Sequence, residues 1–413
     1  MGRVIYNIIV RFFNLLVFLY ASFNRKARSL IEGRRNSFAI LAENLKKGEQ
    51  VIWFHCASLG EFEQGLPLME AIKSSYPAYR LYISFFSPSG YEVQQHNVLA
   101  DCVFYLPADT GSNAKKLINL LNPIAAFFIK YEYWYHYLKT CRDHKIPVFS
   151  VSTILRPDQV FFKFYGGFYR KMLFMFHYFF VQNEETLELL RQLGLTNTIL
   201  SGDTRFDRVH SILNNQTEFR EIKKFKGSEK LVVLGSTWKP DIELWSGFIN
   251  ENDNLRYIIA PHHIEEEDLR YIEKKLQVKT ARYSRINNEQ NNVQVLIIDN
   301  IGMLSALYRY ADFVYVGGAF SEGLHNILEP ATFGKPIIIG KDRRNTKYHE
   351  VVSLINVKGA FEITNSADLK SLMSDLSSDG ELHLHACNAS KTFVQKNLGS
   401  TEIIMRKLKN MLS

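Results

Sequence analysis

The chain has 413 residues, of which 46% are hydrophobic, so it can bury two cores and is not disordered over most of its length. The four cysteines, Cys56, Cys102, Cys141 and Cys387, have spacings that support neither a disulfide framework nor a zinc site, and they indicate a reducing compartment. The formal net charge of +8 is compatible with nucleic acid, an anionic membrane surface or a phosphorylated substrate as a partner.

The segment from Val4 to Phe23 is apolar and long enough to cross a membrane core of roughly 30 Å. It contains Asn7, Arg11 and Asn14, which fall on one face of a helix. This pattern favours an interfacial or shallowly inserted helix, with a full span and a buried helix as alternatives, over a cleaved signal peptide. A basic flank follows, as expected on the cytoplasmic side of a membrane, and consists of Arg25, Lys26, Arg28, Arg34 and Arg35.

Residues 1–35 are therefore predicted to associate with the inner (cytoplasmic) membrane, with the rest of the chain on its cytoplasmic face. From about residue 50, apolar runs alternate with helical or loop stretches, which predicts parallel strands with helices between them. The first set of runs is QVIWFHCAS, LYISFF, CVFYLP, IAAFFIK and IPVFSVS, and the second is KLVVLGST, LRYIIAPHH, VQVLIID, ADFVYVGG and KPIIIG.

The two sets of runs predict two Rossmann-like domains, at residues 36–206 and 230–395. The polar, charged stretch 207–229 is the predicted linker, and residues 396–413 are a predicted C-terminal helix. Two doubly wound α/β domains present the carboxyl ends of their sheets across a cleft, where ligands bind. The sequence lacks GxGxxG and GxxxxGK[ST], so it matches neither a dinucleotide nor a P-loop enzyme. Nucleotide-sugar transferases of the GT-B type fit this exclusion.

The stretch FSEGLHNILEPATFGKPIIIG at 320–340 follows the strand pattern ADFVYVGG. A helix beginning near Leu324 and extending to residue 334 would direct its unpaired first-turn amides, with the Gly317-Gly318 turn, at a phosphate. His325 and Asn326 would add hydrogen-bond donors to this site.

Glu329 lies about one turn further along that helix, where its carboxylate would accept hydrogen bonds from a ribose diol. The alternative is an ordinary helix with Glu329 solvated and His325 serving as a cap. Pro330, inside the predicted helix, is expected to kink it.

Glu61 is the candidate general base. It lies in SLGEFEQG, where Gly60 would let a strand turn sharply into a helix and present Glu61 at the cleft. A carboxylate there would deprotonate an acceptor hydroxyl, and one suffices for an inverting sugar transfer. The alternative is a first-turn glutamate favoured by the helix dipole. Ser87, Ser89 and Gly90 also follow a strand and would donate to an anionic group, although turn chemistry explains them nearly as well.

GLHNILEPA resembles the GGHNPLEPA element of the bacterial 3-deoxy-D-manno-octulosonic acid (Kdo) transferases. FHCASLGE is similar to the HxxSxGE element of that family, and KYEYW to its ETELWP element, with Lys130 in place of the first Glu. The match extends in the family's order through FFSPSG, FYLPAD, VQNEET, GDTRFD, LGSTWKPDIE, APHHIEE, VGGAF and IIGKDRRN. The Arg of the family's NARLS segment is replaced by Ile154, and Arg156 is the candidate substitute.

The resemblance implies that the domain at 36–206 binds the acceptor and that the domain at 230–395 binds the nucleotide sugar. It adds Glu132 and Arg156 to the predicted acceptor-binding residues. The predicted donor-binding residues are then Gly317, Gly318, His325, Asn326 and Glu329 from the residues themselves, together with Ser236, Thr237, His262, Arg205 and Asn345 from the resemblance.

The resemblance further implies inverting transfer of Kdo from CMP-Kdo to a lipid A precursor, a tetraacyl disaccharide bisphosphate, in lipopolysaccharide synthesis. No metal or cofactor is expected, because no DxD-like pair follows a strand, and nucleic acid is not an expected partner. The alternatives are a GT-B glycosyltransferase with a UDP-sugar donor and a non-catalytic membrane-associated protein that binds nucleotide or lipid.

Overall fold

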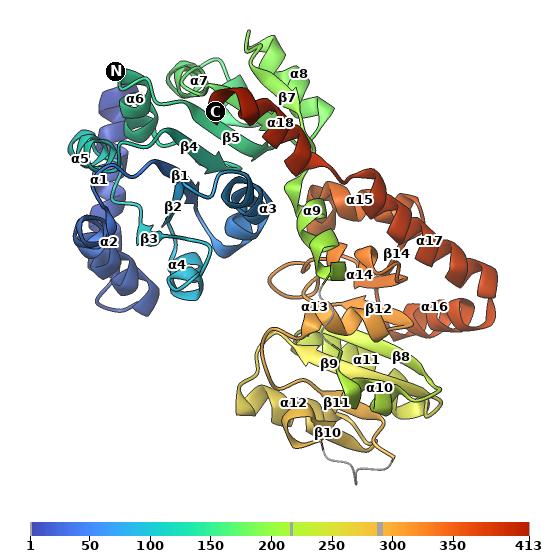
Figure 1. Ribbon diagram of the computed structural model, residues 1–413. Coiled ribbons are helices and arrows are strands. Elements are labelled where there is room, and N and C mark those ends of the chain that lie inside the picture. Colours follow the sequence, from blue (N-terminus) through green and yellow to red (C-terminus); the bar gives the residue numbers. More distant parts are fainter. Residues whose placement is uncertain (1, 215–217, 287–291, 413) are drawn as a thin grey trace. The chain divides into compact units, whose positions relative to one another are not determined.

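The computed structural model describes residues 2–214, 218–286 and 292–412 (Figure 1). It divides into two compact units: unit 1 comprises Met1–Arg208 and Gly399–Ser413, and unit 2 comprises Val209–Leu398. Each unit contains one seven-stranded sheet in which every neighbouring pair of strands is parallel. The predicted α/β fold class with two Rossmann-like sheets is confirmed.

The sheet of unit 1 has the strand order β3-β2-β1-β4-β5-β6-β7. Its strands are β1 (Val51–Cys56), β2 (Arg80–Phe85), β3 (Cys102–Tyr105), β4 (Ala125–Ile129), β5 (Val148–Thr153), β6 (Tyr178–Val181) and β7 (Thr198–Leu200). The helices of this unit are α1 (Gly2–Tyr20), α2 (Arg25–Asn44), α3 (Leu59–Ser75), α4 (Pro88–Gln94), α5 (Gly111–Leu121), α6 (Tyr135–Asp143), η1 (Val160–Phe162), α7 (Gly167–Leu173), α8 (Glu184–Gln192), α9 (Thr204–Ser211, which runs into unit 2) and α18 (Ser400–Leu412).

The burial of strand β1 shows why continuous apolar runs in the sequence correspond to strands of this sheet. All six of its side chains are buried, as expected of a central parallel strand covered by helices on both faces. Successive side chains point to opposite faces, so Trp53 joins one core while Ile52 and Phe54 join the other. The first core includes residues of α2, α5 and α6, and the second includes residues of α3 and α18.

The amino-terminal segment forms two helices that pack on unit 1. Tyr6 of α1 is buried and donates its hydroxyl to Asp109, and Oδ1 of Asn7 lies 2.6 Å from Nε2 of His136. Asn14 accepts a hydrogen bond from Arg34 of α2 at 3.0 Å. Asn7 and Asn14 of the predicted polar face therefore contact the rest of the unit, whereas Arg11 and most of the apolar face are exposed.

Helix α2 continues to Asn44, so the predicted boundary at residue 35 falls inside a helix. The basic flank occupies the first half of α2 and is not a separate linker. The amphipathic pattern runs on past residue 35, because Ser37 and Leu41 of the same helix are also buried.

Helix α18 returns to unit 1 at the end of the chain. Ile404, Leu408 and Leu412 of α18 are buried in the same core as Phe62 and Met69 of α3. The carboxylate of Asp207 accepts hydrogen bonds from the backbone N–H groups of Gly399 and Thr401, at 2.8 and 2.7 Å, where the chain re-enters the unit. The predicted C-terminal helix is thus part of the first unit's core.

The stretch 207–229, predicted to be a linker, contains a helix that packs on unit 2. Residues 215–217 lie outside the described residues, but α10 (Arg220–Lys226) follows them and buries Ile222. Lys226 of α10 lies 2.7 Å from the carboxylate of Asp312 and donates to the carbonyl of Tyr310 at 2.8 Å. This segment therefore packs as part of unit 2.

The sheet of unit 2 has the strand order β10-β11-β9-β8-β12-β13-β14. Its strands are β8 (Lys230–Thr237), β9 (Leu255–Pro261), β10 (Thr280–Arg282), β11 (Val295–Ile297), β12 (Phe313–Val316), β13 (Ile337–Gly340) and β14 (Ala360–Ile363). The helices, besides α10, are η2 (Ile212–Asn214), α11 (Lys239–Glu251), α12 (Glu266–Lys275), η3 (Tyr283–Arg285), α13 (Leu304–Leu307), η4 (Tyr308–Tyr310), α14 (Leu328–Thr332), η5 (Arg343–Lys347), α15 (His349–Asn356), α16 (Ser366–Ser378) and α17 (Gly380–Lys396).

Each sheet has one point where the strand order reverses. In unit 1 it lies between β1 and β4, and in unit 2 it lies between β8 and β12. The connections that leave these strands in opposite directions open a crevice at the carboxyl ends of the strands, where parallel α/β sheets bind ligands. At the first switch point Glu61 follows β1 and Glu132 follows β4. At the second, Thr237 is the last residue of β8 and Gly317 follows β12.

Candidate active site

Glu61 lies in the first turn of α3, directly after the switch-point strand β1. Its carboxylate accepts a hydrogen bond from the backbone N–H of Ala57. Burial, and secondly the charge of Glu132, raise the pKa of Glu61 to about 8, whereas Lys130 acts to lower it. A carboxylate with a raised pKa is a stronger proton acceptor once it is ionised, which suits a general base.

Gly60 does not have the predicted role. It is the second residue of α3, its φ is not positive, and a Cβ at this position would meet no other atom within 4 Å. The chain turns at Ala57 and Ser58, and Ser58 is the N-cap residue. The sharp turn therefore needs no glycine, because the connection uses two residues before the helix begins.

Glu132 belongs to a buried polar network beside Glu61. Its Oε2 lies 3.1 Å from Nε2 of His55 and accepts a hydrogen bond from the indole N–H of Trp134 at 2.6 Å. His55 is fully buried, with Nδ1 2.9 Å from the hydroxyl oxygen of Ser84. Glu132 thus has a structural role in this network, and its acceptor-binding role stays a prediction.

Three cationic residues lie in the same part of unit 1. Burial raises the pKa of Tyr131, whereas the charges of Arg156 and Arg205 lower it and that of Glu61 raises it, so these groups surround one phenol. Lys130 precedes Tyr131 and has a φ of 67°, a left-handed conformation that is uncommon outside glycine and often found at functional sites.

Arg205 was predicted from the sequence to bind the donor, with residues of the second domain. The structure places it in unit 1, where it forms an ion pair with Asp203 at 2.7 Å and lies near the predicted acceptor-binding Arg156. The motif GDTRFD lies at the end of the first unit, because α9 begins before the chain enters the second.

Ser87 and Ser89 lie at the start of α4, after β2, with their hydroxyl oxygens 2.8 Å apart. Gly90 has a packing role: a Cβ at this position would lie 2.3 Å from the ring of Phe85 and 3.2 Å from the backbone nitrogen of Leu59. The glycine is therefore required for the close approach of α4 to β2 and α3, independently of any ligand.

In unit 2 the two switch-point connections are joined by Asp241. Its Oδ2 accepts hydrogen bonds from the backbone N–H groups of Trp238, at 2.8 Å, and Gly318, at 3.1 Å. A Cβ at Gly317 would lie 2.6 Å from Asp241 Oδ2 and 2.6 Å from the carbonyl oxygen of Ser236, so only glycine fits here. Ser236 itself has a φ of 52°.

The loop after Gly318 differs from the prediction. The helix begins at Leu328 and has five residues, so the expected helix start near Leu324 is wrong. The backbone N–H of Gly318 donates to Asp241, that of Gly323 to Gly318, and that of His325 to Gly317. These amides are already used within the protein, so they do not form the free anion-binding turn that the sequence suggested.

Asn326 and Glu329 are brought together. The side-chain amide of Asn326 donates to Oε1 of Glu329 at 3.1 Å, and its oxygen accepts from the backbone N–H of Leu328 at 3.0 Å. Pro330 is in the first turn of α14, where a backbone N–H has no helical partner in any case, so it does not kink the helix. This arrangement fixes the direction of the Glu329 carboxylate.

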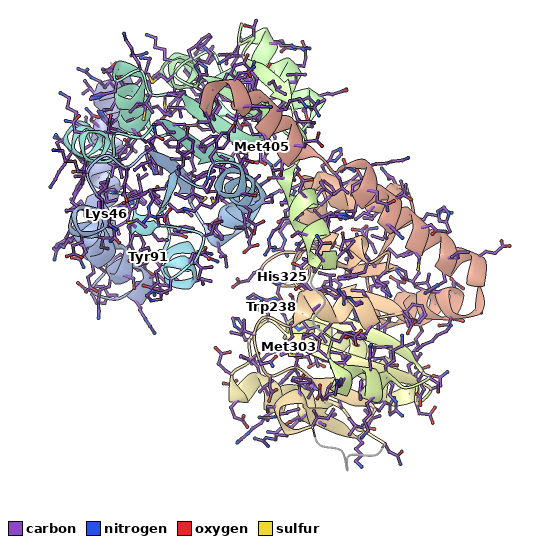
Figure 2. All side chains as sticks on the ribbon, in the orientation of Figure 1. Lys46, Tyr91, Trp238, Met303, His325 and Met405 are labelled. Atoms are coloured by element: carbon purple, nitrogen blue, oxygen red, sulfur yellow. The ribbon has the colours of Figure 1, made fainter. Side chains whose placement is uncertain are left out.

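Three aromatic rings gather beside this loop. The indole of Trp238 stacks on His262, with ring centroids 4.6 Å apart and planes inclined by 16°, and His262 lies 4.6 Å from His325. The indole N–H of Trp238 donates to Nε2 of His325 at 3.2 Å. Figure 2 labels Trp238 and His325 close together on unit 2.

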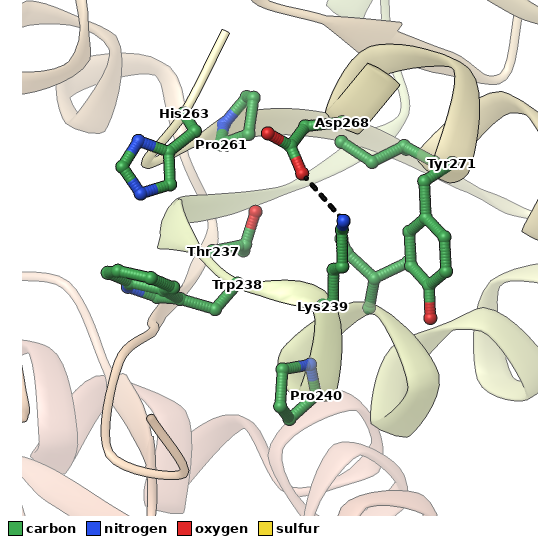
Figure 3. Close-up of a pocket in the computed structure, with 10 residues that line it drawn as sticks. Thr237, Trp238, Lys239, Pro240, Pro261, His263, Asp268 and Tyr271 are labelled. Atoms are coloured by element: carbon green, nitrogen blue, oxygen red, sulfur yellow. Dashed lines mark ion pairs between the residues drawn. The ribbon is translucent and has the colours of Figure 1, made fainter. Parts of the chain in front are cut away.

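Trp238 also lines a cavity of about 330 Å³ between the starts of α11 and α12. Figure 3 shows Trp238 and His263 on one side of the cavity and Tyr271 on the other, with the ion pair between Lys239 and Asp268 at 3.2 Å. Thr237, predicted to bind the donor, faces this cavity, and its buried hydroxyl has no hydrogen-bond partner among the described residues.

Asn345 does not reach the other candidates through its side chain. It is 2% exposed, and its amide donates to the carbonyl of Gly340 at 2.9 Å and to Glu362 at 3.0 Å. It holds the end of β13 against β14. Among the residues in the described ranges, no group of three or more His, Cys, Asp or Glu side chains could hold a metal ion.

Asp241, Trp238 and Lys130 were given no role by the sequence pattern. Asp241 and Trp238 lie in the quoted segment LGSTWKPDIE, but their contacts are with residues about 75 to 90 positions later. For Lys130, the available signal was that it replaces a family Glu two residues before Glu132.

Residues 32–208 match the family model described as 3-Deoxy-D-manno-octulosonic-acid transferase (kdotransferase). The chain is 28% identical to the 3-deoxy-D-manno-octulosonic acid transferase of Chlamydophila psittaci over 302 residues, 70% of this chain and 69% of that relative. It is 26% identical to the enzyme of the same name from Aquifex aeolicus over 342 residues, 81% of this chain and 88% of that relative.

The chain is similar to the Kdo transferases, and the family model and these relatives together support that family. It is therefore a glycosyltransferase, as the sequence motifs predicted. Solved structures support the fold: the UDP-GlcNAc 2-epimerase from Neisseria meningitidis has a TM-score of 0.62 at 14% identity, covering 87% of this chain and 100% of that one. MurG of Acinetobacter baumannii has a TM-score of 0.55 at 11% identity, covering 88% and 99%.

Proposed function

We propose that this protein transfers Kdo from CMP-Kdo to a lipid A precursor in lipopolysaccharide synthesis, with inversion at the sugar carbon. The observation that carries the proposal is the position of Glu61, a half-buried carboxylate with a raised pKa at the switch point of unit 1. In the proposed reaction Glu61 removes the proton from the acceptor hydroxyl as the bond from the sugar carbon to CMP breaks.

Unit 2 is the proposed donor site. Glu329, held by Asn326, accepts hydrogen bonds from the ribose of CMP in this proposal. The rings of His262 and His325 and the loops at Ser236–Thr237 and Gly317–Gly318 lie beside them on the same unit. The reaction as proposed uses neither a metal nor another cofactor.

Unit 1 is the proposed acceptor site. Lys130, Arg156 and Arg205 supply positive charge around Tyr131, which suits an acceptor that carries phosphate groups. Ser87 and Ser89 add hydroxyl groups after β2, where Phe86 stacks on Trp134 with ring centroids 5.2 Å apart.

The proposed location is the cytoplasmic face of the inner membrane. Helix α1 is long and apolar enough to cross a membrane by length and composition. Its exposed apolar residues are Val4, Ile5, Ile8, Ile9, Phe12, Phe13, Leu15, Leu16, Phe18 and Leu19. Because Asn7 and Asn14 of α1 contact the rest of the unit and the basic residues of α2 follow that helix, contact with an anionic lipid surface accounts for both features.

The test is to incubate the purified protein with CMP-Kdo and detergent-dispersed lipid A precursor and to weigh the product by mass spectrometry. An acceptor heavier by one or more Kdo residues supports the proposal. In parallel, CMP should raise the melting temperature and UDP should not. Protection by UDP alone would indicate a UDP-sugar donor, and nucleotide binding without any transfer would indicate a non-catalytic binding protein.

A further inference from the structure

The contact between Trp238 and His325 determines where the imidazole carries its proton. An indole N–H is only a donor, so the nitrogen that it contacts at 3.2 Å must act as an acceptor. A neutral imidazole has one acceptor nitrogen and one N–H. If Nε2 of His325 accepts, the proton of the neutral ring lies on Nδ1.

The surroundings of His325 keep the ring neutral near pH 7. Burial, and secondly the neighbouring His262, lower the pKa of His325 to about 4, whereas the exposed Glu322 acts in the opposite direction. The other titratable groups nearby are His263 and Glu265, which act on His262. The backbone of Trp238 is itself fixed, because its N–H donates to the buried carboxylate of Asp241.

Nδ1 of His325 is available to a ligand. Among the described residues, the hydrogen bond from Trp238 is the only one made by the His325 side chain. The ring lies against Gly318, where an added Cβ would be 2.7 Å from Cδ2 of His325, so it has little freedom to turn on that side. His325 is also one residue before Asn326, whose amide orients Glu329.

We propose that Trp238 is a positioning residue that holds the proton of His325 on Nδ1, so that His325 offers one fixed, neutral N–H to an anionic oxygen of the bound nucleotide. This inference rests on the proposed binding of CMP by unit 2. It assigns a role to a residue that touches no reacting atom and acts only through the histidine ring.

The spectroscopic test is the ¹⁵N NMR spectrum of the imidazole nitrogens in the full-length protein at pH 7.5. In the wild-type protein, His325 should show a protonated Nδ1 and an unprotonated Nε2. Trp238→Phe keeps an aromatic ring for stacking on His262 but removes the N–H, so the His325 signals should move toward a mixture of the two tautomers. A merely structural role of Trp238 would leave the tautomer unchanged.

The binding test is the affinity for CMP, measured by calorimetry. Trp238→Phe should weaken binding by about 3- to 10-fold, the range expected for losing one oriented hydrogen bond. Trp245→Phe is the matched control, because Trp245 lies in α11, of which Trp238 is the N-cap residue, is fully buried and has an indole N–H without a partner in the described structure. It should leave the tautomer of His325 and the affinity for CMP unchanged.

A double-mutant cycle separates this effect from general damage. In a His325→Ala background, Trp238→Phe should have no further effect on CMP affinity, because its influence passes through the missing ring. A wild-type His325 protonated on Nε2, or a Trp238→Phe variant with unchanged CMP affinity, would overturn the proposal. Failure of the wild-type protein to bind CMP would reject the proposed donor, while the tautomer of His325 would still be read independently from the NMR spectrum.

Discussion

The buried carboxylate of Asp241 accepts a hydrogen bond from the hydroxyl of Tyr315 at 2.6 Å. The same carboxylate binds the backbone N–H groups of Trp238 and Gly318, so one side chain joins β12 to both switch-point connections of unit 2. Burial raises the pKa of Asp241, and these three donors counter that effect by favouring the ionised form.

Asp241→Asn should therefore destabilise unit 2 by about 1–3 kcal/mol, because the new amide group offers N–H where an acceptor is needed. Thermal unfolding and CMP affinity measure the effect, and both should decrease. Tyr315→Phe is the matched variant, since it removes only one of the three donors and should cost less. Equal melting temperatures for Asp241→Asn and the wild-type protein would contradict the assigned role.

Glu61→Gln should lower turnover by at least roughly 10²-fold while leaving nucleotide affinity nearly unchanged, because the variant keeps the shape of the side chain but removes the base. Steady-state kinetics and calorimetry check the two expectations. The control is Glu63→Gln on the same helix, where Glu63 forms an ion pair with Arg208 at 2.7 Å and has no proposed role in transfer. Retained turnover in Glu61→Gln would eliminate Glu61 as the base.

The raised pKa of Glu61 gives a pH profile with a defined direction. The base must be ionised, so kcat/KM should rise with pH through about 8. Removing the charge of Lys130, which lowers the pKa of Glu61, should move this limb to higher pH in Lys130→Met. Removing the charge of Glu132, which raises it, should move the limb to lower pH in Glu132→Gln. Limbs that coincide in all three proteins would show that another group controls the profile.

The same shift affects stability. Because the folded pKa of Glu61 lies above its ordinary value, the folded state binds more protons than the unfolded chain between about pH 4.5 and 8. The stabilising contribution is complete below this window and is lost as pH rises through it. The difference in stability between Glu61→Gln and the wild-type protein should therefore favour the variant more at pH 9 than at pH 5. Thermal unfolding of both proteins at the two pH values measures this difference.

Glu329→Ala should weaken CMP binding by about 1–3 kcal/mol, because the ribose hydroxyls would lose a charged acceptor. Asn326→Ala should have a smaller effect in the same direction, since it releases the carboxylate without removing it. Glu381→Ala, an exposed carboxylate in the first turn of α17, is the control. Unaltered CMP affinity in the Glu329 variant would remove its role in ribose binding.

The N-terminal helix can be tested without deleting it. Phe12 and Leu16 are 59% and 47% exposed, so Phe12→Glu with Leu16→Glu should reduce sedimentation with anionic vesicles and leave the protein folded. Tyr6→Phe, which removes the buried contact to Asp109, should lower the melting temperature without affecting sedimentation. Continued sedimentation of the double variant would indicate contact through Phe164 and Tyr165, which are 93% and 65% exposed.

The sequence predicts the two sheets well, because strands such as Val51–Cys56 are continuous apolar runs whose burial requires helices on both sides. Glu61 follows strand β1 directly, as its motif predicts, whereas the roles of Glu61 and Glu329 stay predictions. The start of α14 is missed: Leu324 to Ile327 have a helical pattern but are held in a loop by the hydrogen bond from His325 to Gly317. That contact depends on the fold around it, which local propensity does not contain.

Long-range pairing also bears on residues outside this loop. Asn345 lies in a motif shared with the family, but its amide is used by β13 and β14. Arg205 falls in the predicted domain 36–206, and the structure also places it in unit 1. The roles of Asp241 and Trp238 depend on residues far away in the sequence, which a search for local patterns does not reveal.

The return of α18 to unit 1 has a consequence for the order in which the protein folds during synthesis. Ile404, Leu408 and Leu412 complete a core whose other members are made some two hundred or more residues earlier, and the whole of unit 2 is translated between them. The α18-binding surface of the unit 1 core therefore stays open until α18 has been synthesised. During that interval the newly made chain presents an apolar groove that a chaperone or the chain's own last helix can occupy, and a stop codon before residue 400 would leave it open permanently.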